Sequence, residues 1–108
     1  MGSPFDDDHM EAAGKLQEGS DEMMKYYKQW KDSIAEEAVF DDKMRELIGL
    51  AAAASTQCKY CVHTHGQKAI NHGATKKEIA QVVQIASQVR AGATMSYGLE
   101  SLEYADEE

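Results

Sequence analysis

The spacing of apolar residues restricts the fold of this chain more than any other feature of its sequence. These residues recur every three or four positions along most of its length. Such spacing places side chains on one face of an α-helix, whereas a half-buried strand needs strict alternation, and no stretch alternates in that way with β-branched residues. The one Pro, at position 4, interrupts nothing downstream. The sequence therefore predicts an all-α fold, a bundle of about five helices.

The first two expected helices follow one another closely. One covers about residues 21–39, after Ser20, whose hydroxyl can cap its first turn. Its aromatic residues recur at helical spacing, which favours packing over a binding role; they are Tyr26, Tyr27 and Trp30. The other begins at Asp41 or Asp42 and ends near Ser55. Its second half is apolar nearly all round, which predicts that it is buried.

Three further helices are expected in the second half of the chain. The third carries the segment CKYCVHTHGQKAINHG and ends at Gly73, which suits the position just beyond a helix C-terminus. Thr75 and Glu78 form a capping box that opens the fourth. A fifth helix is expected over about residues 93–104.

The size of the chain predicts one domain that associates with copies of itself. Residues 1–9 resemble a vector-derived leader, expected to be disordered, and residues 10–108 form the expected domain. A chain of 108 residues buries only about 60 to 70% of the surface that it exposes when unfolded. We therefore expect oligomerisation, as a trimer or a multiple of trimers, to complete the helical core.

The charge of the chain argues against two classes of partner. Its formal net charge is −8, and it remains −5 without residues 1–9. Acidic domains repel phosphate backbones and anionic lipid headgroups, so neither nucleic acid nor a membrane surface is an expected partner. The longest apolar run, Leu47–Ala54, is far too short to cross a bilayer. No export signal is visible, which predicts a cytoplasmic location.

Cys58 and Cys61 are the two cysteines of the chain, in a C-x-x-C arrangement. A disulfide between them would close so short a loop that it would add little stability. In a chain without an export signal, such a pair is more often catalytic, redox-active or metal-binding than structural.

His65 completes a cluster with these cysteines. On a helix, Cys61 lies three residues from Cys58 and four from His65, so the three side chains share one side. A helix N-terminus near Cys58 favours the thiolate, and an adjacent imidazole can exchange its proton, so one thiol should ionise more readily than a free cysteine. His63 is expected at the surface or at a subunit contact, and His72 as a helix-capping residue.

Glu46 is the fourth candidate. If the chain reverses around Thr56 and Gln57, Glu46 and His65 differ in height along the resulting helix pair by only about 5 Å, which allows a side-chain contact. The alternative is a solvated helix-surface glutamate paired with Lys43 or Arg45.

Together the four residues form the pattern E-x11-C-x2-C-x3-H. With the later segment GATKKEIAQVV, this pattern resembles the AhpD-like alkylhydroperoxidases of the carboxymuconolactone decarboxylase superfamily. The resemblance implies an all-helical fold, assembly into trimers or hexamers, and reduction of hydroperoxides by the dithiol without haem, flavin or metal. A thiol, thioredoxin-like or lipoyl-type protein would return the electrons.

The resemblance also assigns roles to single residues. Cys61 would attack the peroxide and Cys58 would resolve the product, with Glu46 and His65 as the proton relay. Tyr60 departs from the family's pattern, because the best-known peroxidases have a histidine immediately before the second cysteine. This departure bears on peroxidase activity more than on dithiol redox activity.

Three alternatives remain. The chain can act as a general disulfide reductase of the same fold, or as a decarboxylase, although the decarboxylase branch lacks the cysteine pair. The third is a zinc-binding structural module in which Cys58, Cys61 and His65 are joined by His63 or Glu46. The favoured reading needs no cofactor and no metal.

Overall fold

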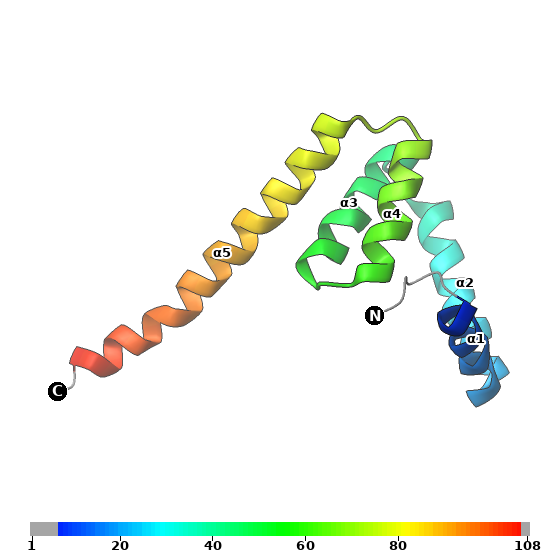
Figure 1. The fold of residues 1–108 in the computed structure, drawn as a ribbon, viewed down its shortest axis with the longest axis horizontal. Helices are drawn as coiled ribbons and strands as arrows, with labels where there is room; N and C mark the ends of the chain where they lie inside the picture. The colour runs from blue at the N-terminus through cyan, green and yellow to red at the C-terminus, as the bar shows by residue number, and fades with distance from the viewer. Residues whose placement is uncertain (1–6, 107–108) are drawn as a thin grey trace. The chain divides into compact units, whose positions relative to one another are not determined.

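A computed structural model describes residues 7–106, and every regular element in that range is helical. Their bounds are α1 (Asp7–Leu16), the 3₁₀ turn η1 (Gln17–Gly19), α2 (Asp21–Glu37), α3 (Asp42–Ser55), α4 (Lys59–Asn71) and α5 (Lys76–Asp106) (Figure 1). The predicted all-α class is confirmed. Contacts divide the chain into two compact units, Met1–Asp41 and Asp42–Glu108. That residues 10–108 act as one domain stays a prediction.

The first described helix, α1, is not among the helices predicted from the sequence. Asp7 and Asp8 lie in the first turn of α1, where the positive end of the helix dipole favours carboxylates. The expected disorder of residues 1–9 is therefore wrong for residues 7–9. Residues 1–6 lie outside the described residues, and the vector origin of the segment stays a prediction.

In α2 the predicted cap is present. The Ser20 hydroxyl accepts a hydrogen bond from the Met23 amide at 3.2 Å. Within the unit Met1–Asp41 the aromatic residues of this helix are exposed; they are Tyr26, Tyr27 and Trp30. That they pack against other residues therefore stays a prediction.

The second unit is built around an antiparallel pair, α3 and α4, which lie side by side (Figure 1). Between them the chain turns sharply, with Gln57 in the left-handed region at φ 59°. The Thr56 hydroxyl bonds to the Ala52 carbonyl at 3.0 Å, and the Cys58 amide bonds to the Ala53 carbonyl at 3.0 Å. The predicted chain reversal at Thr56 and Gln57 is confirmed.

The core of this unit is small. Its buried apolar residues are Leu47, Leu50, Ala53, Ala69 and Ala86, from α3, α4 and α5. The predicted burial of the second half of α3 holds for one face only, because Ala52 on the other face is exposed. Two neighbouring helices cannot cover every side of a third.

The junction between α4 and α5 is hydrogen-bonded throughout. Gly73, at φ 95°, ends α4 as predicted. The amides of His72, Gly73 and Ala74 all bond to carbonyls of the last turn of α4. Thr75 and Glu78 form the predicted capping box: the Thr75 amide donates to Glu78 at 2.9 Å, and the Glu78 amide donates to the Thr75 hydroxyl at 3.1 Å.

α5 is a single helix of 31 residues, so the two helices predicted for this region are wrong as separate elements. No proline or cap stands between them, and Gly92 is accommodated within the helix because glycine lowers helix stability without breaking the hydrogen-bond ladder. Beside α3, a Lys43–Glu78 ion pair of 2.9 Å joins the two helices. Among residues 7–106, no helix combines the length and apolar character needed to cross a membrane.

Beyond its contact with α3, α5 exposes a series of large apolar residues. They are Met95, Tyr97, Leu99, Leu102 and Tyr104, with exposed fractions from 58% to 85%. Between α3 and the first half of α5 there is also an open, largely apolar groove of about 310 Å³, lined by Met44, Leu47, Ile48, Ala51, Glu78, Gln81, Val82 and Ile85.

Candidate functional site

The site begins at the N-terminus of α4. Cys58 is the N-cap residue, and its sulfur accepts a hydrogen bond from the Cys61 amide at 3.2 Å. Cys58 and Cys61 are joined by a disulfide, with their Cα atoms 5.2 Å apart. This bond is the oxidised form that a redox-active C-x-x-C pair adopts. After reduction, the same amide and the helix dipole would favour negative charge on the Cys58 sulfur.

Glu46 and His65 meet across the α3–α4 pair. Glu46 Oε2 lies 2.7 Å from His65 Nδ1, and Glu46 is only 6% exposed. An ionised carboxylate can only accept, so we assign the shared proton to Nδ1. The contact predicted from the chain reversal is confirmed, and the surface-glutamate alternative is wrong because the side chain is buried.

Arg45 contacts the other oxygen of this carboxylate. Its Nη2 lies 3.7 Å from Glu46 Oε1, and its Nη1 lies 3.0 Å from Asp42 Oδ1. A buried carboxylate needs partners for its charge, and Glu46 has one at each oxygen. From the sequence, Arg45 is expected only as a surface partner of Glu46. Its position beside Glu46 in the sequence was the available signal for this second role.

Residues 21–104 match the carboxymuconolactone decarboxylase family. The chain belongs to this family. The superfamily predicted from the sequence, which also contains the AhpD-like proteins, is thereby confirmed.

Proteins from several organisms resemble this family member. It is 37% identical over 90 residues to an uncharacterized protein of Haemophilus influenzae, covering 83% of this chain and 80% of the relative. It is 32% identical over 71 residues to uncharacterized protein 4 in the cox locus of Paracoccus denitrificans, covering 66% of this chain. The match spans 64% of that relative, which is less than two thirds of its length.

A crystal structure of a protein from Methanobacterium thermoautotrophicum has the same fold. The TM-score is 0.76 at 23% identity, over 83% of this chain and 98% of the other. At this level of identity the similarity supports the fold of the family member and does not extend to its activity.

Two further histidines lie on α4 or at its C-terminal end. His63 is exposed, as predicted. His72 is the C-cap residue, and its Nδ1 lies 3.9 Å from Asp42 Oδ2. Its predicted position at the end of the helix is confirmed, and its backbone amide makes the capping hydrogen bonds. Tyr60, which replaces the histidine of the family's peroxidases, is 40% exposed.

A metal site receives no support from the arrangement of donors. Among the residues that the structure describes, no three or more His, Cys, Asp or Glu side chains gather so as to hold an ion. The disulfide also occupies both sulfurs that a zinc module would use.

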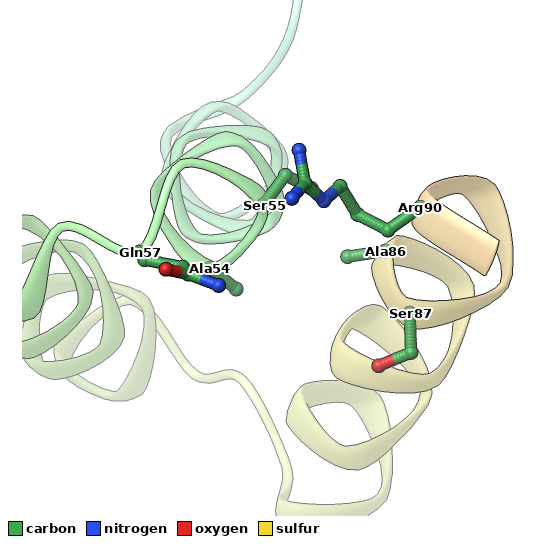
Figure 2. A pocket seen from close by; sticks show the side chains of 6 residues that line it. All are labelled: Ala54, Ser55, Gln57, Ala86, Ser87 and Arg90. Carbon is green, nitrogen blue, oxygen red and sulfur yellow. The ribbon is translucent and has the colours of Figure 1, made fainter. Parts of the chain in front are cut away.

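A hollow of about 290 Å³ lies between the C-terminal end of α3 and the middle of α5. Figure 2 shows Arg90 extending from α5 toward Ser55, with Ala86 and Ser87 on the same helix. Gln57 and Ala54 complete the lining, so the hollow borders the turn that precedes Cys58 without including either cysteine.

Proposed function

We propose that this member of the family is a thiol-disulfide oxidoreductase that reduces hydroperoxides with the Cys58–Cys61 dithiol. The observation that carries the proposal is the 2.7 Å contact between Glu46, which is buried on α3, and His65 on α4. The disulfide lies at the N-terminus of the same helix as His65. His65 lies four residues after Cys61 in α4, so the imidazole and the sulfur share one side of that helix. A dithiol reaction needs a group that accepts and returns protons, and this imidazole is placed for that role.

In the first step, His65 accepts the proton of the Cys61 thiol. The Cys61 thiolate attacks the terminal oxygen of the hydroperoxide, whose O–O bond breaks. The sulfur becomes a sulfenic acid, and the alkoxide takes the proton from His65 and leaves as an alcohol.

In the second step, the Cys58 sulfur attacks the Cys61 sulfur. The S–O bond of the sulfenic acid breaks, and the departing hydroxide takes the Cys58 proton and leaves as water. Two thiols and one hydroperoxide thus give one disulfide, one alcohol and one water. The hydrogen bond from the Cys61 amide supports Cys58 in this role, because it stabilises negative charge on the attacking sulfur.

A dithiol donor then completes the cycle by exchange with the disulfide. We propose that this donor is a thiol compound or a lipoyl-type protein. A reducing compartment such as the cytoplasm would keep it supplied.

Disulfide reduction is a second candidate, favoured by Tyr60. A phenol replaces the imidazole that the family's peroxidases carry between their cysteines, and a phenol is a much weaker proton carrier near neutral pH. Exchange with a disulfide substrate depends on the thiolate and does not require cleavage of an O–O bond.

One experiment separates these candidates. The fully reduced protein is mixed in a stopped-flow instrument with an organic hydroperoxide and, separately, with small and protein disulfides. We expect the hydroperoxide to oxidise Cys58 and Cys61 faster. Faster oxidation by disulfides would replace the first candidate with the second, and no oxidation by either would overturn both.

We also propose that the active form is a homo-oligomer, a trimer or a hexamer. Among the described residues, the buried apolar core contains three alanines and two leucines, whereas α5 after Arg90 exposes five large apolar side chains. A second copy of the chain would cover this surface by the same burial of apolar area that forms a core. A stable monomer at micromolar concentration in light scattering would contradict this proposal.

A further inference from the structure

Gly49 lies one helical turn after Glu46 on α3, directly beneath the His65 ring. A Cβ atom at this position would lie 2.7 Å from His65 Nδ1, 2.9 Å from Cε1 and 3.0 Å from Cγ. Atoms in a folded protein do not approach a Cβ so closely, so any side chain here would displace the ring.

Other helix glycines of the chain are not constrained in this way. A Cβ at Gly66 would meet only Leu50 Cδ1 at 3.9 Å, which is an ordinary contact, and a Cβ at Gly98 would meet nothing within 4 Å. Glycine within a helix lowers stability by about 0.5–1 kcal/mol relative to alanine. Gly49 is followed closely by four consecutive alanines, Ala51–Ala54, so its lack of a side chain needs a local reason.

We propose that Gly49 is a positioning residue for the proton relay. It provides the space on α3 in which the His65 ring packs with Nδ1 against Glu46, and this fixes the ring nitrogen Nε2 as the one that exchanges protons with the dithiol. The effect on catalysis rests on the function proposed above. The effect on the ring follows from the packing of α3 against α4 alone.

Gly49→Ala has a specific expected consequence. The side chain of His65 is 37% exposed, so the ring can move outward into solvent when a methyl group occupies its place. Glu46, which is buried, then loses its closest partner and keeps only Arg45 at 3.7 Å. The substitution therefore breaks the relay without removing either of its residues.

Gly66→Ala is the matched control. It also replaces a glycine within a helix of the same hairpin, and it lies next to His65 in sequence, but its methyl group clashes with nothing. Both variants gain the same helix propensity, so a difference between them reports the clash with the ring.

The first measurement is nitrogen-15 NMR of the His65 ring. In the wild type and in Gly66→Ala we expect the signal of a protonated, hydrogen-bonded Nδ1, and in Gly49→Ala we expect that signal to be lost. This readout does not depend on any enzymatic activity. An unchanged His65 signal in Gly49→Ala would overturn the inference, whatever the function of the protein.

The second measurement is a kinetic cycle with His65→Ala, which removes the ring. Gly49→Ala should slow oxidation of the thiols by about 100-fold, the loss expected when a reacting group is displaced by about 1 Å. In the His65→Ala background the same substitution should cost nothing, because Gly49 acts through the ring. A persistent penalty would show that Gly49 acts by another route.

The cycle also separates the two proposals. If His65→Ala oxidises at the wild-type rate, the relay of the proposed function is wrong. If His65→Ala is slow but Gly49→Ala is not, the relay stands and the role of Gly49 is wrong.

Discussion

The α3–α4 hairpin and the second half of α5 differ in the exposure of their leucine side chains. In the hairpin, Leu47 and Leu50 are at most 6% exposed. The buried carboxylate of Glu46 contacts His65 on α4 and Arg45 on its own helix, α3. In α5, Leu99 and Leu102 are 58% and 64% exposed, and the side-chain hydrogen bonds there are local, such as that of Thr94 to the Arg90 carbonyl. The comparison teaches that the Glu46–His65 contact forms within one chain, whereas the second half of α5 exposes an apolar surface, which we propose that a second copy of the chain covers.

The largest expected effect tests whether the chemistry belongs to the hairpin. Cys58→Ser and Cys61→Ser should each abolish cyclic thiol oxidation, because no intrachain disulfide can form. Mass spectrometry after peroxide treatment should find a sulfenic acid on Cys61 in Cys58→Ser.

Light scattering provides the control for both variants, which should keep the wild-type oligomer. A different outcome would be that Cys58→Ser changes the oligomer while the wild type shows no redox activity. The disulfide would then have only a structural role, in holding the start of α4 in the conformation needed for assembly, and the hairpin would carry no redox chemistry.

The next effect tests the relay. Glu46→Gln and His65→Gln should each slow thiol oxidation by about 10²- to 10⁴-fold, the range for a positioned acid-base group. The double variant should be scarcely slower than the worse single variant, because residues that act as a unit are not additive. Stopped-flow oxidation of the reduced proteins measures all three rates. If Glu46→Gln oxidised at the wild-type rate while His65→Gln oxidised slowly, Glu46 would have a structural role only and would not belong to the relay.

A pair of leucine substitutions sharpens the contrast in stability. Leu50→Ala should lower the free energy of unfolding by about 2–5 kcal/mol, because it leaves a cavity in the core. Leu99→Ala should change it by no more than about 0.5 kcal/mol when the chain is dilute enough to be monomeric. Urea unfolding at several protein concentrations measures both.

Leu99→Asp extends this comparison to assembly. A carboxylate on the exposed apolar face should shift light scattering toward monomer while leaving the Glu46–His65 contact intact, because α5 beyond residue 90 takes no part in that contact. An unchanged oligomer would show that another surface holds the chains together.

The smallest effect concerns the ion pair between α3 and α5. Hydrogen bonding from the Thr75 amide and then from Lys43 lowers the pKa of Glu78. Because this pKa is lowered in the folded state, the charged form of Glu78 stabilises the fold at every pH above the pKa of glutamate in the unfolded chain. This contribution disappears as the pH falls through the lowered pKa of the folded state. Glu78→Gln should therefore melt below the wild type at pH 7, with a smaller difference near pH 3. A difference independent of pH would exclude a role for the charge.

Local signals in the sequence were sufficient for the caps and the hairpin. Ser20, Thr75 and Glu78 act on amides three residues away, and the contact of Glu46 with His65 followed from counting residues on each side of a turn. These features depend on backbone geometry that is the same in every helix.

Other features depend on the third dimension and could not be predicted. The two helices expected after Thr75 form one, because Gly92 permits a break without requiring it. The exposed face of α2 shows that periodicity identifies an apolar stripe without identifying what covers it. Gly49 gave no signal at all, since its importance lies in the distance to a ring 16 positions later in the chain.

The hydrogen-bonded junction between α4 and α5 has a consequence for the cooperativity of the fold. Every amide from His72 to Thr75 has an acceptor within the last turn of α4 or on Glu78. In hydrogen exchange, a flexible connection would appear as a run of unprotected amides that separates two units of opening. Here the protection should extend from α4 through Thr75, so that the end of α4 opens together with the connection that follows it.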